Sequence, residues 1–308
     1  MTWDSCYRGD GVERDVVLPE PPPWRTFPRP SLAEVFQPPD GLADAVNAAL
    51  CLRRPLLVTG APGSGKSTII DSVATELKLG VPLRWHVTSQ STLTDALYRY
   101  DVLGRIHAHQ LGGATDDIAP FLQLGPLGTA LLPAARPRAL LIDEIDKSDL
   151  DLPSDLLNVL ERGEYEIPEL ARHTEAEVNV QEWGGDSTHT VVRGRVQCTA
   201  FPFIVITNNG ERDFPAPFLR RCVRFTMPSL EDTEMLKKVV RAHLADVDVD
   251  RGVTLDLINE FADRVRSGEL LAVDQLLGAA YLLSEGGVPG KARRRNLLDQ
   301  LLRELTSA

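Results

Sequence analysis

The segment that most constrains the fold of this chain is residues 60–67, which read Gly-Ala-Pro-Gly-Ser-Gly-Lys-Ser. It fits the pattern G-x-x-x-x-G-K-[ST] and lies between an apolar run, residues 55–59, and a helical pattern over residues 68–77. A loop between a buried strand and a helix presents backbone N–H groups and the positive end of the helix dipole to an anion. Its glycines let the backbone wrap that anion without Cβ clashes. The sequence therefore predicts a phosphate-binding loop.

Individual side chains of this loop have predicted roles. We expect the Lys66 ammonium to reach the β- and γ-phosphates of a nucleotide and the Ser67 hydroxyl to ligate Mg²⁺. The predicted phosphate-binding residues are Gly60, Ala61, Pro62, Gly63, Ser64, Gly65, Lys66, Ser67 and Thr68.

The bulk properties favour a globular chain whose main partner is not nucleic acid. The chain has 308 residues, 43% of them hydrophobic, which suffices for one large domain or two of ordinary size. A formal net charge of −11 offers no broad cationic field for a phosphodiester backbone. The start, residues 1–4, lacks a signal-peptide pattern, and no apolar run approaches the ~18–20 residues that span a bilayer. We expect a cytoplasmic protein without a membrane span.

The pattern along the chain predicts three parts: an arm, an α/β core and a helical domain. Residues 1–30 are charged and then proline-rich, which is typical of an extended arm, and the pattern leaves open whether this arm lies across a neighbouring subunit. Residues 31–228 form the predicted α/β nucleotide-binding core, and residues 229–308 the smaller all-helical domain. Five apolar runs predict a parallel sheet covered by helices on both faces: residues 55–59, 83–88, 139–142, 203–207 and 222–226.

Other segments complete the expected organisation. We predict a short helix over residues 92–100 and irregular, glycine-containing chain over residues 102–135. Within residues 164–200, alternating polarity on either side of residues 184–186 predicts a β-hairpin. The predicted C-terminal helices cover residues 229–245, 254–267, 271–284 and 291–306.

The apolar run over residues 139–142 ends in two carboxylates, Asp143 and Glu144. A nucleoside triphosphatase needs a carboxylate for Mg²⁺ and a group that orients and polarises the attacking water. We expect Asp143 to hold Mg²⁺ and Glu144 to act on the water. The alternative, a strand that ends in a charged turn, is common in isolation.

Two further strand ends carry polar residues. The fourth apolar run ends in Asn208-Asn209, and a strand-end amide there suits a γ-phosphate or an attacking water; Asn-Asn-Gly also favours a simple turn. Arg220 and Arg221 precede the fifth run. They are either surface charges or arginine fingers that reach the γ-phosphate of a neighbouring subunit, which requires an oligomer.

Taken in order, these motifs resemble those of the AAA+ ATPases. The segments that carry the resemblance are G-A-P-G-S-G-K-S, L-L-I-D-E-I-D, V-I-T-N-N and F-L-R-R-C, within residues 31–285. The chain resembles the MoxR-like branch in residues 97–101, in residues 125–127 and in the hairpin segment, residues 164–200.

The resemblance implies a 5-1-4-3-2 sheet, a helical lid and a ring, usually of six subunits, with ATP and Mg²⁺ at each interface. It implies that Asp143 and Glu144 are Walker B residues. Asn209 becomes sensor 1, with Asn208 as fallback, and Arg221 becomes the arginine finger, with Arg220 as fallback. MoxR-like proteins resemble chaperones that remodel a protein client, often with a von Willebrand factor A partner. Residues 120–127 are similar to the family's pore-facing insert, where Phe121 and Leu122 either contact substrate or belong to the core.

One segment departs from the family pattern. The lid usually carries a sensor 2 cation at the start of its third helix, and residues 269–276 contain none. Arg264 and Arg266 lie at least one helical turn upstream. The family pattern therefore does not identify the residue that would couple lid closure to hydrolysis.

The leading hypothesis is an ATP-hydrolysing ring that remodels a protein. The first alternative is a nucleotide-gated switch or scaffold with slow hydrolysis in a multi-protein complex. The second alternative is a nucleic-acid translocase, which the acidic balance disfavours.

Overall fold

The computed structural model describes residues 6–18, 20–28, 33–111, 117–245, 247–284 and 291–303, without the side chains of residues 291–294. Its contacts divide the chain into two units. The first contains residues 1–39, 60–68 and 227–308, and the second contains residues 40–59 and 69–226.

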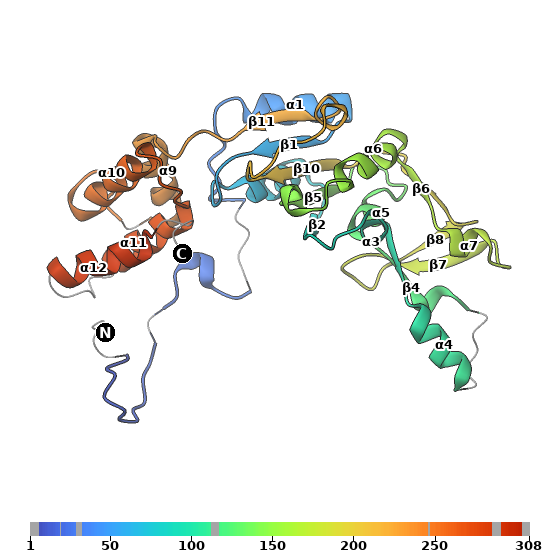
Figure 1. Ribbon diagram of the computed structural model, residues 1–308, viewed down its shortest axis with the longest axis horizontal. Helices are drawn as coiled ribbons and strands as arrows, with labels where there is room; N and C mark the ends of the chain where they lie inside the picture. The colour runs from blue at the N-terminus through green and yellow to red at the C-terminus, as the bar shows by residue number, and fades with distance from the viewer. Residues whose placement is uncertain are drawn as a thin grey trace. The chain divides into compact units, whose positions relative to one another are not determined.

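The second unit contains a five-stranded, fully parallel sheet (Figure 1). Its strand order is β11-β1-β10-β5-β2. Numbered as the five predicted strands, this order is 5-1-4-3-2, so the predicted fold class and strand order are confirmed. The strands are β1 (Leu56–Thr59), β2 (Leu83–His86), β5 (Ala139–Asp143), β10 (Phe203–Asn208) and β11 (Val223–Thr226).

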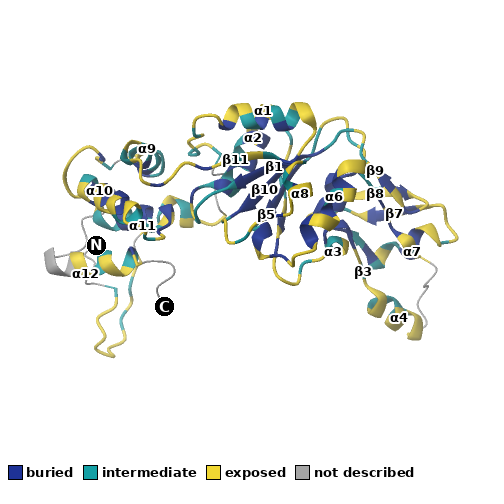
Figure 2. Cartoon of the chain, turned by 45° about the horizontal axis from the view of Figure 1, so that its top comes forward, coloured by how far each residue is buried: buried dark blue, intermediate teal, exposed yellow. Residues whose placement is uncertain are grey.

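The central strands of this sheet are buried on both faces, as Figure 2 shows. All six residues of β10 are buried, and so are the first four of β5. Parallel sheets need such cover because their crossover helices pack on both faces. Helices α1 (Leu42–Leu52), α2 (Ile69–Leu77) and α5 (Pro126–Ala130) contact these strands. The continuous apolar runs of the sequence therefore fold into the core.

The same unit contains a second, six-stranded sheet of mixed direction, with strand order β3-β4-β7-β8-β9-β6. Its β7–β8 hairpin places Val178 opposite Val191, which confirms the predicted hairpin around residues 184–186. Residues in β7 alternate between exposed and buried, as expected for a sheet with one covered face. The strands are β3 (Tyr98–Tyr100), β4 (Leu122–Leu124), β6 (Glu164–Glu166), β7 (Glu177–Gln181), β8 (Thr188–Val192) and β9 (Arg195–Gln197).

Two local predictions are wrong. The helix predicted over residues 92–100 ends at Leu97, as α3 (Leu93–Leu97), because the next three residues form β3 and pair with β4. The described residues within 102–135 are not irregular throughout: they contain α4 (Val102–Gln110), β4 and α5, together with the 3-10 turn Ala119–Phe121, whereas residues 112–116 lie outside the described residues. Helix α4 buries none of its residues, and its N-cap is Asp101, whose side chain accepts from the Gly104 N–H. Its apolar residues Val102, Leu103 and Ile106 are exposed.

Three short helices and one longer helix join these strands. They are α6 (Leu152–Arg162), α7 (Pro168–Ala171), α8 (Ala216–Leu219) and the 3-10 turn Ile145–Lys147. Leu122 is buried within β4, so it belongs to the core, whereas Phe121 is half-buried.

The first unit contains the predicted C-terminal helices around their own apolar core. They are α9 (Thr233–His243), α10 (Gly252–Arg266), α11 (Val273–Ser284) and α12 (Lys291–Leu301). The end of the last predicted helix, residues 304–306, lies outside the described residues. Among the helices that the structure describes, none is both long and apolar enough to span a bilayer.

Part of the proline-rich arm packs on these helices. The Trp24 ring makes edge contacts with His243 and Tyr281, with centroids 6.1 and 6.0 Å away. Tyr281 donates a hydrogen bond to the Glu20 carbonyl at 2.7 Å. The arm therefore contacts its own chain around residues 20–24. The predicted arm also includes residues 1–5, 19, 29 and 30, which lie outside the described residues.

Candidate functional site

The predicted phosphate-binding loop leaves β1 at Gly60 and ends in a 3-10 turn, Lys66–Thr68, directly ahead of α2. Gly63 and Gly65 have φ angles of +71° and +84°, in the left-handed region that favours glycine. The Lys66 ammonium lies inside the loop, where it donates to the Gly60 and Ala61 carbonyls at 2.8 Å each. The loop thus holds a cation within a curved backbone.

Two polar groups of the loop are buried. Lys66 is only 6% exposed and Ser64 8%. The Ser64 hydroxyl oxygen has no hydrogen-bond partner among the described residues. Buried polar groups in folded proteins are nearly always hydrogen-bonded, so an unpaired hydroxyl beside a buried ammonium is consistent with a site built for a polar ligand.

The start of α11 packs directly on this loop, within the first unit. A Cβ added at Gly63 would lie 2.8 Å from the Ala272 Cβ and 3.1 Å from the Val273 backbone nitrogen. Only glycine fits at this position, because a positive φ angle disfavours other residues and because an added Cβ would clash with Ala272. Small apolar residues therefore occupy the lid-helix start at which the family resemblance implies a cation.

The two upstream arginines are engaged elsewhere in the same unit. Arg264 pairs with Glu269 at 2.6 Å, and Arg266 pairs with Asp263 at 2.5 Å. Each of these ion pairs joins residues close in sequence. Neither arginine makes a described contact with the phosphate-binding loop.

The carboxylates at the end of β5 are joined to the neighbouring strand β10 by Thr207. The Thr207 hydroxyl donates to an Asp143 carboxylate oxygen at 2.7 Å and accepts from the Glu144 N–H at 2.8 Å. Glu144 has φ +59° and ψ +51°, a left-handed conformation that is uncommon for a residue other than glycine. The threonine thus fixes the position of one carboxylate and the backbone of the other.

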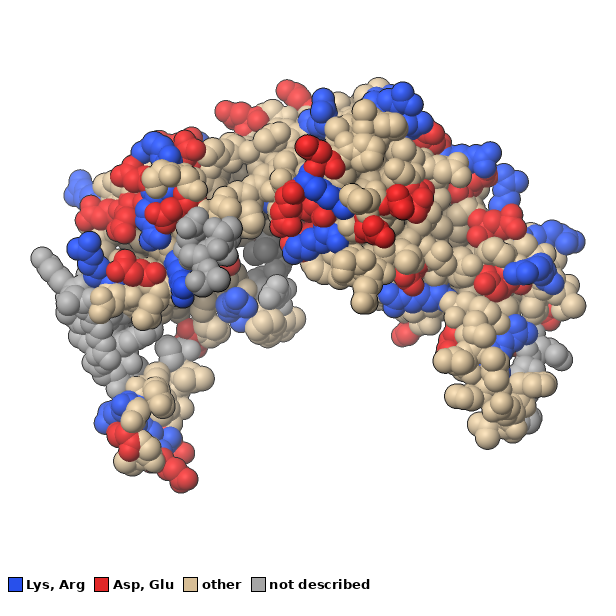
Figure 3. Space-filling model, in the orientation of Figure 1, with Lys and Arg blue, Asp and Glu red and all other residues tan. Residues whose placement is uncertain are grey.

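Three side chains surround the Glu144 carboxylate. Lys147 donates to it at 2.8 Å and the Asn209 amide at 3.4 Å, and a His86 ring nitrogen lies 3.6 Å away. Burial alone would raise the pKa of Glu144, but the Lys147 hydrogen bond and charge, the Asn209 amide and the His86 charge together lower it. Glu144 is therefore ionised at neutral pH, as a group that polarises water must be. Figure 3 shows acidic and basic side chains side by side where Figure 1 labels β5.

The two candidate asparagines have different surroundings. Asn209 lies beside Glu144, and its backbone N–H donates to the buried Asp146 carboxylate at 3.0 Å. Asn208 is buried and directs its amide to Thr59, 3.4 Å away, and its oxygen to the Gly210 N–H at 2.7 Å. The geometry thus favours Asn209 for contact with the reacting groups and a turn role for Asn208.

The two candidate arginines lie between α8 and β11. Arg221 pairs with Glu161 of α6 and donates from Nη1 to the Pro217 carbonyl at 3.0 Å. The Arg220 side chain is exposed, and its carbonyl accepts from Arg54 at 3.5 Å. Neither arginine makes a described contact with Asp143 or Glu144.

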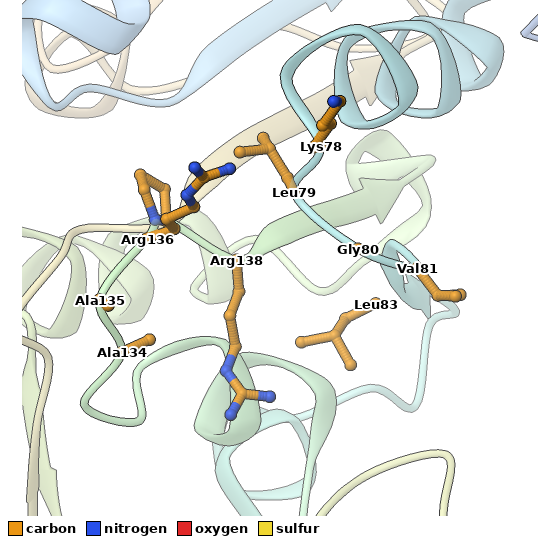
Figure 4. Close-up of a pocket in the computed structure, with 10 residues that line it drawn as sticks. Lys78, Leu79, Gly80, Val81, Leu83, Ala134, Ala135, Arg136 and Arg138 are labelled. Carbon is orange, nitrogen blue, oxygen red and sulfur yellow. The ribbon is translucent and has the colours of Figure 1, made fainter.

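A surface cleft of about 450 Å³ lies elsewhere in the second unit (Figure 4). It is lined by residues 78–81 and 83, at the start of β2, and by residues 134–138, which lead into β5. These segments precede the strands, whereas the carboxylates follow β5. The cleft is therefore separate from the predicted catalytic residues.

Sequence reasoning missed four residues around the carboxylates: Thr207, Asp146, Lys147 and His86. Thr207 had a usable signal, since it is a hydroxyl near the end of an otherwise apolar run beside two strand-end amides. Lys147 and Asp146 follow the carboxylates in sequence. His86 ends β2, and only the strand order brings it beside β5.

Comparison with known families gives one match. The family model described as AAA domain (dynein-related subfamily) matches residues 55–222, more than half of the chain. The matched span runs from the residue before β1 to the residue before β11. No curated protein sequence matches this chain.

Comparison with solved structures gives only low similarity scores. NtrX from Brucella abortus in complex with ADP has a TM-score of 0.47 at 14% identity, covering 90% of this chain and 59% of that chain. The Holliday junction branch migration motor RuvB from Thermotoga maritima has 0.41 at 14%, covering 84% and 66%. PCH-2 from C. elegans has 0.39 at 15%, covering 85% and 66%. This chain thus spans less than two thirds of the NtrX chain.

Proposed function

This chain belongs to the AAA domain family (dynein-related subfamily), and on that premise we propose that it binds ATP with Mg²⁺ and hydrolyses it. The observation that carries the proposal is the arrangement of three strand ends. The phosphate-binding loop follows β1 directly along the chain, and β10 and β5 are the next strands in the sheet. Thr207 and Asn209 hold the two carboxylates at the ends of those strands.

Each residue has a proposed role in this reaction. Lys66 binds the β- and γ-phosphates, and backbone N–H groups within residues 60–68 donate hydrogen bonds to the phosphate oxygens. Glu144 polarises the attacking water, and Asn209 orients that water or the γ-phosphate. Arg221 completes the site of a neighbouring subunit, with Arg220 as the second candidate.

The residues present fit Mg²⁺. A carboxylate and a hydroxyl, Asp143 and Ser67, supply hard oxygen donors of the kind that Mg²⁺ prefers. Thr207 bonds one oxygen of the Asp143 carboxylate, which fixes the direction of the other. When bound, Mg²⁺ neutralises phosphate charge and orients the phosphates.

The proposal extends to a ring, usually of six subunits, that remodels a protein client in the manner of MoxR-like ATPases. A von Willebrand factor A domain protein is the expected kind of partner. What supports the ring is that Arg221 makes no described contact with Asp143 or Glu144 of its own chain, because its described contacts are with Glu161 and Pro217. The protein is proposed to act in the cytoplasm.

One observation favours a second candidate, a nucleotide-gated switch with slow hydrolysis. Ala272 and Val273 occupy the place at which a sensor 2 cation is expected, so the lid start contacts the loop without charge. Turnover of the purified protein, compared with that of Glu144→Gln, distinguishes the two candidates. Equal, near-zero rates in the presence of a partner protein would favour the switch.

The central test is Lys66→Ala. Removing the ammonium from the loop should abolish nucleotide binding, measured by displacement of a fluorescent ATP analogue, and with it turnover. Lys78→Ala is the matched control because Lys78 is exposed beside the cleft of Figure 4. Unaltered binding and turnover in Lys66→Ala would refute the proposed function.

A further inference from the structure

The ion pair between Arg221 and Glu161 joins the segment before β11 to the last turn of α6. Glu161 accepts from the Arg221 Nε, and the Pro217 carbonyl accepts from Nη1 at 3.0 Å. Among the described residues, Nη2 has no acceptor. Two points of attachment therefore fix the plane of the guanidinium and leave one of its terminal nitrogens for another partner.

Helix stability does not explain the position of Glu161. A carboxylate in the last turn of a helix opposes the helix dipole, which favours cations there. The side chains are 28% exposed for Arg221 and 52% for Glu161, and partly exposed ion pairs of this kind stabilise a fold little. The pair therefore contributes little to stability, and its main structural effect is to hold the Arg221 guanidinium in one orientation.

The charges around Glu161 keep it ionised. The Arg221 hydrogen bond is the main cause that lowers the pKa of Glu161, and the charges of Arg221 and Arg220 add to it. The same hydrogen bond raises the pKa of Arg221. Both partners are charged at neutral pH, so the attachment persists under the conditions of ATP hydrolysis.

We propose that Glu161 is a positioning residue that holds Arg221 for the γ-phosphate of ATP bound to the neighbouring subunit. This inference rests on the proposed function and adds a residue to which the motifs assign no role. A long arginine side chain loses rotamer freedom when it engages a phosphate, and an arginine that is already ordered loses less. Displacement of a catalytic group by about 1 Å can cost roughly 10²-fold in rate, so the pair controls hydrolysis without touching nucleotide.

The first test is Glu161→Gln, which keeps the shape and removes the charge. We expect kcat to fall about tenfold while KM for ATP and the oligomeric state stay unchanged, because the ammonium and the loop that bind ATP are intact. Glu164→Gln is the matched control, because Glu164 pairs with Arg195 at 2.6 Å within the six-stranded sheet. The kcat of this control variant should be unchanged. Glu161→Asp should recover part of the rate. An unchanged kcat in Glu161→Gln would overturn the proposal.

The second test shows whether Glu161 acts across the subunit boundary. Glu161→Gln protein and Glu144→Gln protein are mixed, and mixed assemblies are verified by native mass spectrometry. In such an assembly a Glu161→Gln subunit has an intact Glu144, and its neighbour supplies an intact Arg221–Glu161 pair. ATP turnover should therefore rise above that of either variant alone. No rise would mean that Glu161 acts within its own subunit, which would overturn the proposal.

The same mixing with Arg221→Ala in place of Glu161→Gln separates this inference from the proposed function. Recovery with Arg221→Ala but not with Glu161→Gln would reject the positioning role alone. No hydrolysis by the wild-type assembly would reject the proposed function and this inference together. No effect of Arg221→Ala would reject this inference alone and leave Arg220 as the candidate arginine.

Discussion

The two sheets of the second unit differ in how their residues are buried, and this difference separates chemistry from surface. The five-stranded sheet has central strands buried on both faces, and its strand ends carry Asp143 and Asn209 with their partners. The six-stranded sheet alternates between buried and exposed residues and carries none of the predicted site residues. A strand fixed on both faces holds the residues that follow it more firmly than a half-exposed strand does. The predicted site residues therefore lie at the ends of the strands with the most complete cover.

The largest effect expected from this comparison is on turnover. Glu144→Gln, at the end of β5, should lower kcat by about 10²–10⁴-fold, because it removes the group that polarises water and keeps ATP binding. Glu177→Gln, on the exposed face of β7, should leave kcat unchanged. A coupled ATPase assay measures both variants. Similar rates for the two would place the reaction outside the five-stranded sheet.

A smaller effect is expected on stability. Ile206→Ala removes a fully buried side chain from β10 and should lower the free energy of unfolding by about 2–5 kcal/mol. Val192→Ala, in β8 with half of its surface exposed, should change it by no more than about 0.5 kcal/mol. Urea denaturation followed by circular dichroism compares the two. A greater loss from Val192→Ala would mean that the six-stranded sheet is the more tightly packed.

A third effect is expected on thiol reactivity. Burial raises the pKa of Cys222, ahead of β11, to about 12, and raises that of Cys198, after β9, by a smaller amount. A raised pKa leaves less thiolate at pH 8, so iodoacetamide should modify exposed Cys51 first, then Cys198, and Cys222 last. Peptide mass spectrometry over a time course measures the order. Modification of Cys222 at the same rate as Cys51 would contradict the burial of Cys222 ahead of the edge strand β11.

The parts of the fold that the sequence predicted well are those whose signal is local. The runs that became β1, β5 and β10 are continuously apolar, and burial on both faces requires that pattern. Helix α4 has no buried residue, so packing against the described chain does not require a helical apolar period in its sequence. Strands β3 and β4 have three residues each and exist through their pairing, which no local window contains.

The residues of the candidate site also divide into those with a local sequence signal and those without one. The loop at residues 60–67 and the pair Asp143-Glu144 were predicted from spacing and from their position after apolar runs. The contacts of His86 and Thr207 depend on which strands are neighbours, and sequence order does not give that directly. The roles of Asn209 and Arg221 remain predictions, to which the geometry adds their nearest partners.

The close approach of Gly63 to Ala272 has an energetic consequence. A ligand that reshapes the loop must either shift the first turn of α11 or bind against its resistance. The free energy of ligand binding is then shared between the loop and the helical domain, and by reciprocity any partner that repositions α11 changes the affinity of the loop by the same factor. Without a cation at this point, the signal passes through van der Waals contact and is insensitive to salt. On the proposed function, a single glycine thereby makes the C-terminal helices part of the nucleotide-binding equilibrium.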